Sequence, residues 1–340
     1  MLRLIGILIT VLYAIATAVV VWPQFFHLEQ TFPFAQTVAV RGAVLAAFGV
    51  IAVLALLMMF AKPVRGFAAS LLIVSLIGGL AVGAIAAVRG VSAGELPAKT
   101  DGSIRVMAWN TAGEAVSAET IAKTVLAQEA DVVSLPETAE SVGEDIALRL
   151  REQGHPMWVH HVKFRPDVPN GPQAWETTIL ISPKLGSYSV IESSANGSNN
   201  TGSVPSVVAM PVDGKGPTIV AVHAVAPRAQ AMTRWQSDLR WIADQCPGGN
   251  VILAGDFNAT LDHMAPLGVA GGDMGACRDV ASRTGTGMAG TWPSSLPMLA
   301  SAPIDHVMAT PNWKATGSLV LDDAGGSDHR ALIAQLEPAG

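Results

Sequence analysis

Several side chains that can bind a metal ion or carry a proton follow short apolar runs beyond residue 100. Carboxylate and amide oxygens are ligands for hard divalent cations such as Mg²⁺ or Mn²⁺, and an imidazole oriented by a carboxylate can act as a base or contact an anionic group. Hydrolysis of a phosphate ester needs such a cation, an oriented water molecule and help for the leaving oxygen. The residues that could supply this chemistry are Asn110, Glu137, His223, Asp256, Asn258, Asp305, Asp328 and His329.

Short runs rich in β-branched residues precede or contain most of these side chains, and they predict strands. The expected strands are 103–110, 131–135, 177–181, 188–192, 207–210, 218–223, 251–254, 304–309 and 331–336. Helices are expected at 118–130, capped by Thr120 or Ser117, and at 229–245. Many short strands with few helices indicate two packed sheets flanked by helices, an α/β sandwich. The strand ends of such a scaffold would bring the polar side chains to one edge.

The 340-residue chain is 50% hydrophobic and 14% charged, and its long apolar runs lie in the N-terminal third. Uncharged runs at 4–22, 42–61 and 67–88 are each long enough to cross a hydrocarbon core of roughly 30 Å as a helix. We therefore expect residues 1–90 to form a membrane anchor with three transmembrane helices. A cleaved signal peptide is the alternative for the first run, but two further apolar runs follow it.

Lys and Arg in the short loops predict the orientation of this anchor. Arg3 precedes the first run, and Lys62 and Arg65 lie between the second and third, whereas residues 23–37 contain no Lys or Arg. Arg41, at the edge of the second run, weakens the asymmetry. The pattern indicates an N-terminus on the inner side and places everything after the third helix on the outer face.

Residues 91–102 are mostly small or polar and contain Gly and Pro, so they are expected to be a linker to a domain at 103–340. From residue 96 onward, 16 Lys and Arg stand against 25 Asp and Glu, a net charge of −9 with His neutral. This balance argues against strong DNA binding but not against a small phosphorylated substrate. Cys246 and Cys277 could form a disulfide in an oxidising compartment or remain two buried thiols.

Seven short motifs are spread over residues 103–336. They are WN at 109–110, LPET at 135–138, VH at 222–223, GDFN at 255–258, TWP at 291–293, PIDHVM at 303–308 and SDH at 327–329. In this order they resemble the endonuclease/exonuclease/phosphatase superfamily, which includes DNase I, AP endonucleases, sphingomyelinases and inositol-polyphosphate phosphatases. The anchoring runs together with TWP and PIDHV look most similar to membrane-attached bacterial members of the YafD-like type. The resemblance implies a DNase I-like four-layer α/β sandwich with two mixed sheets.

The resemblance also implies a metal site and a catalytic pair. Glu137 matches the family's main ligand for one or two Mg²⁺ or Mn²⁺ ions, with Asn110 and Asp328 as further metal ligands. Asp305 and His329 match a pair in which the carboxylate orients the imidazole. His329 would then contact the scissile phosphate or act as the base.

Asp256 and Asn258 match residues that align the attacking water and hold the phosphate. Phe257 between them should point the other way into the core, because neighbours on a strand alternate. His223 would bind the phosphate or act as an acid towards the leaving group. Two departures from the family pattern are Pro136, where many members have Gln, and an Ala-Val pair in place of Asn-Thr before the strand-end His. The second departure removes a hydrogen-bonding partner and leaves the detailed role of His223 open.

Three further residues are candidates for substrate binding. Trp292 could be a substrate-facing aromatic or a packing residue. His161 and Arg165 are expected on a loop at 156–175, from which they could contact an anionic substrate. Substrate choice would reside in this loop and in a second one at 193–205, which is rich in Gly, Ser and Asn.

The sequence therefore predicts a membrane-tethered, extracytoplasmic, divalent-metal-dependent phosphoesterase. The leading form is a phosphodiesterase acting on an envelope lipid or another phosphorylated molecule. Alternatives are a metal-dependent nuclease and a non-catalytic member that binds a phosphorylated ligand or a partner protein. The resemblance and the loop charges place the chain in the cytoplasmic membrane of a bacterium, with the catalytic domain outside.

Overall fold

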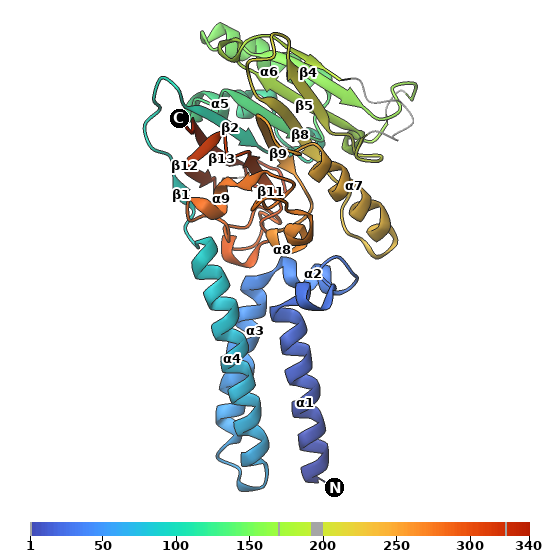
Figure 1. Cartoon of the computed structure of the whole chain (residues 1–340), viewed down its shortest axis with the longest axis vertical. Coiled ribbons are helices and arrows are strands. Elements are labelled where there is room, and N and C mark those ends of the chain that lie inside the picture. The colour runs from blue at the N-terminus through green and yellow to red at the C-terminus, as the bar shows by residue number, and fades with distance from the viewer. Residues whose placement is uncertain (1, 169–170, 192–199, 324) are drawn as a thin grey trace. The chain divides into compact units, whose positions relative to one another are not determined.

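The computed structural model describes residues 2–168, 171–191, 200–323 and 325–340. The chain divides into two compact units, Met1–Val88 and Arg89–Gly340. The first unit consists of helices, and the second contains two β-sheets with the helices that cover them (Figure 1).

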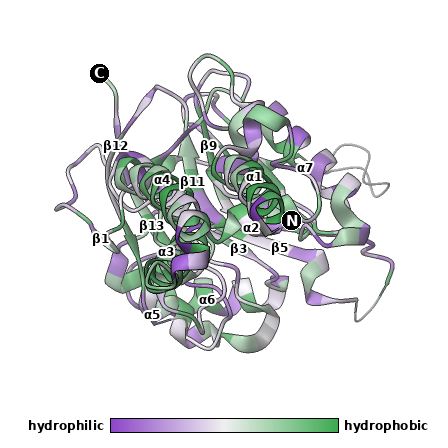
Figure 2. Cartoon of the chain, turned by 90° about the horizontal axis from the view of Figure 1, so that it is seen from below, coloured by the Kyte–Doolittle hydropathy of each residue, from purple (hydrophilic) through white to green (hydrophobic). Residues whose placement is uncertain are grey.

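Three long helices make up most of the first unit. They are α1 (Leu2–Val21), α3 (Arg41–Met58) and α4 (Arg65–Arg89). Each contains a stretch long and apolar enough to cross a membrane, and Figure 2 shows them mainly in the colour of hydrophobic residues. The short elements between them are η1 (Pro23–Phe26), α2 (Phe34–Ala39) and η2 (Lys62–Val64). The prediction of three helices able to span a membrane is confirmed by their length and composition.

Small residues let these helices approach one another closely. A Cβ on Gly78 of α4 would lie 2.7 Å from the ring of Phe48 on α3 and 2.8 Å from Thr17 on α1. The hydroxyl groups of Tyr13 and Ser75, 2.8 Å apart, share a hydrogen bond between α1 and α4. Glycine at position 78 is therefore required where the three helices meet, as in other packed apolar helices.

The second unit is built on two mixed sheets. The strands of the first are β1 (Gly94–Glu95), β2 (Ile104–Ala108), β3 (Val132–Pro136), β4 (Trp158–Lys163), β5 (Glu176–Ile181), β12 (Trp313–Val320) and β13 (Leu332–Pro338). Those of the second are β6 (Tyr188–Val190), β7 (Val207–Pro211), β8 (Thr218–His223), β9 (Val251–Asp256), β10 (Arg278–Asp279) and β11 (Asp305–Ala309). Their orders are β1-β12-β13-β2-β3-β5-β4 and β10-β11-β9-β8-β7-β6.

Helices lie outside the sheets. The α-helices are α5 (Ala118–Gln128), α6 (Glu140–Glu152), α7 (Met232–Asp244), α8 (Leu261–Met264) and α9 (Val280–Arg283). Short 3-10 helices are η3 (Gly113–Ala115), η4 (Gln173–Trp175), η5 (Pro183–Leu185), η6 (Ala229–Ala231), η7 (Ala265–Leu267) and η8 (Met298–Ala300). Of the two residues predicted to cap α5, Ser117 does so, because its side chain accepts a hydrogen bond from the Thr120 N–H. Two mixed sheets with flanking helices confirm the predicted sandwich.

Alternation along the strands produces two hydrophobic cores. Val106 of β2 joins a cluster shared by both sheets, together with Ile219 of β8. Its neighbour Met107 belongs to a second cluster, with Ile121 of α5 and Ile146 of α6. Because successive side chains of a strand point to opposite faces, one strand supplies both clusters. This explains why the strands read as continuous apolar runs.

The sequence patterns do not predict α6, β4 or β12. The expected loop at 156–175 is wrong over its first part, because β4 pairs with β5 from Trp158 to Lys163. His161 therefore lies on a strand. The pattern fails at β4 because most of its side chains are only half-buried, and polar and apolar residues mix on it. The expected substrate loop at 193–205 lies partly outside the described residues.

Two connections hold irregular segments of the second unit in place. Residues 94–95 form β1 and pair with β12, so the segment expected as a linker supplies an edge strand. A disulfide joins Cys246 to Cys277, with their Cα atoms 5.9 Å apart. It links the segment after α7 to the start of β10.

Candidate active site

Strand pairing brings the polar strand-end residues to one edge of the two sheets. β8 and β9 are parallel with His223 opposite Asp256, and antiparallel β11 places Asp305 opposite Asp256 on the other side. In the other sheet β13 starts where its antiparallel neighbour β2 ends, which places His329 near Asn110. We call this gathering the catalytic edge; it also includes Glu137, Asn258 and Asp328.

The end of β9 and the turn that follows it have unusual backbone angles. A Cβ on Gly255, whose φ is 143°, would lie 2.1 Å from the carbonyl oxygen of Val222, so only glycine fits between the two strands. Asn258 has a left-handed φ of 46°, which Asn tolerates better than most residues. Phe257 is buried as predicted, and its ring packs edge-on against His306 with 5.4 Å between centroids. These angles aim the polar side chains of the turn at the catalytic edge.

Asn110 joins two carboxylates from different sheets. Its Nδ2 donates to Glu137 Oε1 at 3.1 Å and to Asp256 Oδ2 at 3.0 Å, and its Oδ1 accepts from the Ala112 N–H. Asn258 donates to Asp256 twice, from Nδ2 to Oδ2 at 3.1 Å and from its peptide N–H to Oδ1 at 2.8 Å. Glu137 has a left-handed φ of 60°, an arrangement often kept at functional sites. Two amides therefore fix the orientation of Asp256.

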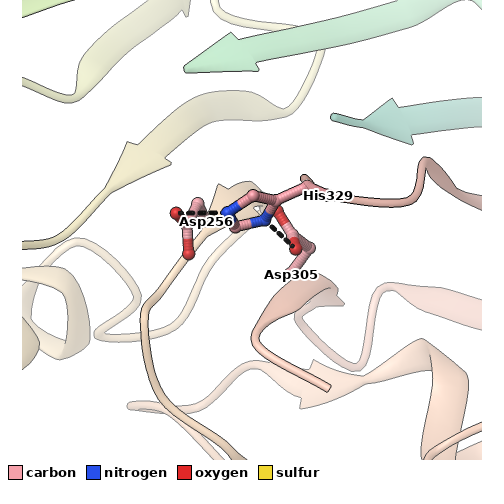
Figure 3. Close-up of side chains that lie close together, drawn as sticks. All are labelled: Asp256, Asp305 and His329. Atoms are coloured by element: carbon pink, nitrogen blue, oxygen red, sulfur yellow. Dashed lines mark hydrogen bonds and ion pairs between the residues drawn. The ribbon is translucent and has the colours of Figure 1, made fainter. Parts of the chain in front are cut away.

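The imidazole of His329 lies between two buried carboxylates (Figure 3). Nδ1 is 2.8 Å from Asp305 Oδ2, and Nε2 is 3.8 Å from Asp256 Oδ2. One ligand atom from each of the three residues lies within 4.8 Å of the others. Asp305 Oδ1 is buried and accepts no hydrogen bond from the described residues. Asp305 thus fixes the ring of His329 and leaves Nε2 facing Asp256.

Burial and neighbouring charges shift the pKa values of this site. Burial opposes protonation of His329, yet Asp305 and Asp256 outweigh it and raise the pKa of this imidazole to about 10. Burial raises the pKa of Asp256 to about 7, although the charge on His329 acts in the opposite direction. Burial and the nearby His329 lower the pKa of His223 to about 3. At neutral pH His329 is therefore protonated and His223 is neutral.

His223 ends β8 beside Asp256 and lies near Glu137. Its Nε2 is 3.7 Å from Glu137 Oε1, and its peptide N–H donates to Ser206 Oγ at 2.9 Å. Its Nδ1 is buried and has no hydrogen-bond partner among the described residues. A buried polar atom without a partner is costly, so this ring nitrogen calls for an explanation such as a missing ligand.

Two hydroxyl groups hold the backbone that carries Asp305 and His329. Thr291 Oγ1 accepts a hydrogen bond from the Asp305 N–H at 3.1 Å. Ser327 Oγ donates to the Asn110 carbonyl at 2.7 Å and accepts from the His329 N–H at 3.0 Å. Both residues lie in motifs that carry the resemblance, TWP and SDH, but the motifs alone do not reveal these positioning contacts.

Trp292 and Asp328 meet at the rim of the site. The indole Nε1 of Trp292 donates to Asp328 Oδ2 at 2.9 Å, while 41% of this tryptophan stays exposed. The buried guanidinium of Arg330 holds the loop that carries Trp292, through the carbonyl oxygens of residues 290, 294 and 296. Sequence reasoning does not single out Arg330, whose importance comes from contacts with a distant loop.

His161 and Arg165 make their contacts elsewhere. His161 Nδ1 is 2.9 Å from Thr178 Oγ1, and its Nε2 is 3.5 Å from Glu176 Oε2. Arg165 is half exposed and pairs with Asp167 at 3.0 Å. Across the described segments, no hydrogen bond or ion pair joins either residue to the catalytic edge. Their contact with an anionic substrate stays a prediction.

Comparison with known proteins shows the family and the fold of this chain. The sequence model of the Endonuclease/Exonuclease/phosphatase family matches residues 107–329, and the chain belongs to that family. Its fold is similar to an endonuclease/exonuclease/phosphatase from Beutenbergia cavernae DSM 12333, with a TM-score of 0.54 and 21% identity over 70% of this chain and 72% of that one. No curated protein matches the chain.

Two other solved structures share the fold at lower identity. Humanized D. rerio TDP2 carrying 14 mutations has a TM-score of 0.51 and 16% identity, covering 70% of this chain and all of that one. The human Nocturnin catalytic domain with bound sulfate anion has a TM-score of 0.50 and 15% identity, covering 72% and 97%. The predicted DNase I-like fold is confirmed. Members of this superfamily are generally metal-dependent hydrolases; the more specific YafD-like type stays a prediction.

Proposed function

We propose that this chain is a membrane-tethered, extracytoplasmic, divalent-metal-dependent phosphoesterase, and that it hydrolyses the phosphodiester of an envelope lipid or another phosphorylated molecule. The observation that carries the proposal is the catalytic edge, where an imidazole held between two buried carboxylates lies near a third carboxylate bridged by an amide. In this set the protonated imidazole is a cation held in a fixed position, and the carboxylates are oriented hydrogen-bond acceptors. Phosphoryl transfer requires charged groups that are held in place in this way.

The donor set fits a hard divalent ion at Glu137. One of its oxygens accepts from Asn110, its side chain is 27% exposed, and the other oxygen has no hydrogen-bond partner in the described part of the chain. The resemblance names Asn110 and Asp328 as further oxygen ligands. The Oδ1 of Asn110 accepts from the Ala112 N–H here, so the amide would have to turn to bind the ion. The cluster of Asp256, Asp305 and His329 fits a metal less well, because its ligand atoms are already used: Asp305 bonds the Nδ1 of His329, and Asp256 accepts from two amides. An ion bound at Glu137 would neutralise charge on the phosphoryl oxygens.

The other residues have roles that follow from their protonation and contacts. Asp256, fixed by two amides, would accept a hydrogen bond from the attacking water, and its raised pKa suits it to take up a proton near neutral pH. The His329 cation would contact the phosphate. Neutral His223 favours phosphate binding over the acid role: its lowered pKa means that it lacks the acidic imidazolium proton at neutral pH, while its remaining N–H can still donate a hydrogen bond.

Turnover by the purified full chain in detergent tests this proposal. A generic diester, phospholipid and plasmid DNA would each be offered with Mg²⁺ or with EDTA, to the wild type, to Glu137→Gln and to a matched variant, Glu152→Gln, on the exposed end of α6. We expect metal-dependent turnover that only Glu137→Gln abolishes. Preferential cleavage of DNA would favour a nuclease, and absence of turnover with retained metal binding would favour a binding protein.

Metal binding can be measured apart from activity. Titration with Mn²⁺, followed by electron paramagnetic resonance, should give bound ion in the wild type and much less in Glu137→Gln. Equal binding by both proteins would move the metal to other ligands, with Asp256, Asp305 and His329 as the next candidates.

The location is part of the same proposal. Three helices able to cross a membrane and the distribution of Arg3, Lys62 and Arg65 support an outer catalytic unit. A reporter fused after Gly340 should be active only on the outer face, and a cytoplasmic signal would contradict the proposed orientation.

A further inference from the structure

A cavity lies at the ends of β11 and β13 that are remote from the catalytic edge. It has a volume of about 710 Å³, and its lining includes Ala309 at the end of β11 and Leu336 near the end of β13. Asp305, at the other end of β11, is four residues away, which corresponds to roughly 13 Å along a strand. Figure 1 shows the neighbouring elements β12, β13 and α9 near the C-terminus.

Three cations surround this cavity in a unit that is acidic as a whole. They are Arg278 on β10, Arg283 at the end of α9 and Lys314 on β12, against a single acidic side chain, Glu337. Strand pairing fixes the position of Arg278, which lies opposite Ala309 of β11. The local charge is therefore positive where the surrounding domain is negative.

The side chains of these cations lack partners within the described ranges, where none of the three makes a side-chain hydrogen bond or an ion pair. The Nε of Arg278 is also buried. Buried polar atoms in folded proteins nearly always have partners, and one that has none calls for an explanation such as a missing ligand. A bound anion would satisfy it.

The remaining lining is apolar. The half-buried Trp313, whose indole Nε1 donates to Asn250 Oδ1 at 2.7 Å, forms part of the wall together with Leu336 and Pro338. Volumes of several hundred Å³ are usual for small-molecule sites that combine an apolar lining with a few polar groups. The lining thus matches a molecule with one anionic and one apolar part.

We propose that this cavity is a second binding site, separate from the catalytic edge, for a phosphorylated molecule with an apolar moiety. Arg278, Arg283 and Lys314 bind the phosphoryl group, for which guanidinium groups are well suited, and Trp313 contacts the apolar part. The proposal does not depend on the proposed phosphoesterase activity, because it concerns binding at different residues.

Calorimetric titration with phenylphosphonate, which has no ester bond to hydrolyse, tests this site. The full chain in neutral detergent with EDTA would be compared with the double variant Arg278→Gln/Arg283→Gln. A matched control removes two exposed cations elsewhere, Lys184→Gln/Arg240→Gln. All three proteins would carry His329→Gln, which removes the competing cation of the catalytic edge.

We expect the cavity variant to bind phenylphosphonate more weakly by roughly tenfold or more, and the control to bind it like the parent. Equal affinity in all three proteins, or equal loss in both double variants, would overturn the proposal. Circular dichroism would verify that the variants keep their fold. Inorganic phosphate should bind more weakly than phenylphosphonate, and equal affinity would refute the apolar contact.

Two sources of such a phosphoryl group can be distinguished with the same protein. In nanodiscs of phosphatidylcholine, phenylphosphonate should retain its affinity. Addition of phosphatidic acid would lower that affinity if a lipid headgroup fills the cavity, and would leave it unchanged if the natural ligand is water-soluble. Either result identifies the source of the phosphoryl group. The affinity of the double variant Arg278→Gln/Arg283→Gln for phenylphosphonate is the reference value for both measurements.

Discussion

At one end of β11, Asp305 bonds to His329, which in turn faces Asp256. At the other end, Ala309 lies beside Arg278, whose guanidinium has no bonded partner among the described residues. The same strands therefore carry a buried network of mutually oriented groups at one end and a cavity with uncompensated cations at the other.

This difference indicates how each end would work. At the catalytic edge, Asp256 accepts hydrogen bonds from two amides and a backbone N–H, so little reorganisation is needed when charge develops there. At the cavity, the cations would become fully partnered only with a ligand. We expect substitutions at the catalytic edge to affect catalysis and stability strongly, and substitutions around the cavity to affect mainly binding.

The largest expected effect comes from His329→Gln. It removes the cation held between Asp305 and Asp256, and we expect kcat for diester hydrolysis to fall by roughly 10²–10⁴-fold. A matched variant away from the catalytic edge, His155→Gln, should keep its rate; His155 is half-buried and its Nε2 is 3.0 Å from the Ala130 carbonyl oxygen. Initial rates at saturating substrate measure this effect, and a loss below tenfold would remove His329 from the chemistry and weaken the comparison.

The strand ends of the catalytic edge follow from the sequence, because polar residues after apolar runs must meet when strands pair in register. Asn110, Glu137 and His223 come together for this reason. The supporting contacts could not be predicted, since Arg330 and Ser327 act through backbone groups of distant loops.

The cavity at the other end is equally hidden in the sequence. Its cations come from short elements with no periodic signal, and β12, which carries Lys314, is itself not predicted. His161 shows the same limit, since its strand β4 mixes polar and apolar residues. Patterns of hydrophobicity predict buried strands well, and they say little about contacts made by exposed edges and loops.

Arg89→Ala tests how much a buried ion pair near the catalytic edge contributes to stability. Both terminal nitrogens of Arg89 bond the carboxylate of Asp262, at 2.8 and 2.9 Å, six residues after Asp256. Because Asp262 is almost fully buried, removing Arg89 should lower the free energy of unfolding by roughly 2–4 kcal/mol. Thermal unfolding measures this loss of stability, and Arg240→Ala, at an exposed arginine, is the control.

The double variant Arg89→Ala/Asp262→Asn should recover part of the lost stability, because it no longer buries an unpaired charge. If it recovers none, the unpaired charge of Asp262 is not the cause of the loss.

A buried ion pair between the two ends gives a smaller, pH-dependent effect. His306 Nδ1 and Asp279 Oδ1 are 2.9 Å apart, and these residues adjoin Asp305 and Arg278 in sequence. Burial opposes the charge on His306, but Asp279 raises its pKa above 6.5; burial likewise opposes the charge on Asp279, but His306 lowers its pKa below 3.8.

The signs of these shifts define a pH window. The contribution of His306 is complete below pH 6.5 and is lost as pH rises through its raised pKa, whereas that of Asp279 is present above pH 3.8 and is lost at lower pH. The melting temperature of the wild type should therefore fall more between pH 6 and pH 9 than that of His306→Gln. Parallel curves for the two proteins would show that the pair does not titrate in this range.

The smallest effect is expected from Arg283→Gln at the cavity. Arg283 is exposed at the end of α9, and its side chain forms no ion pair or hydrogen bond in the described part of the chain, so the substitution breaks no side-chain bond. We expect the free energy of unfolding in phosphate-free buffer to change by no more than about 0.5 kcal/mol, as for other surface substitutions. Thermal unfolding would be compared with Lys184→Gln. A loss of more than about 1 kcal/mol would mean that Arg283 already has a partner within the fold, and the contrast between the two ends of β11 would then rest on Arg278 and Lys314 alone.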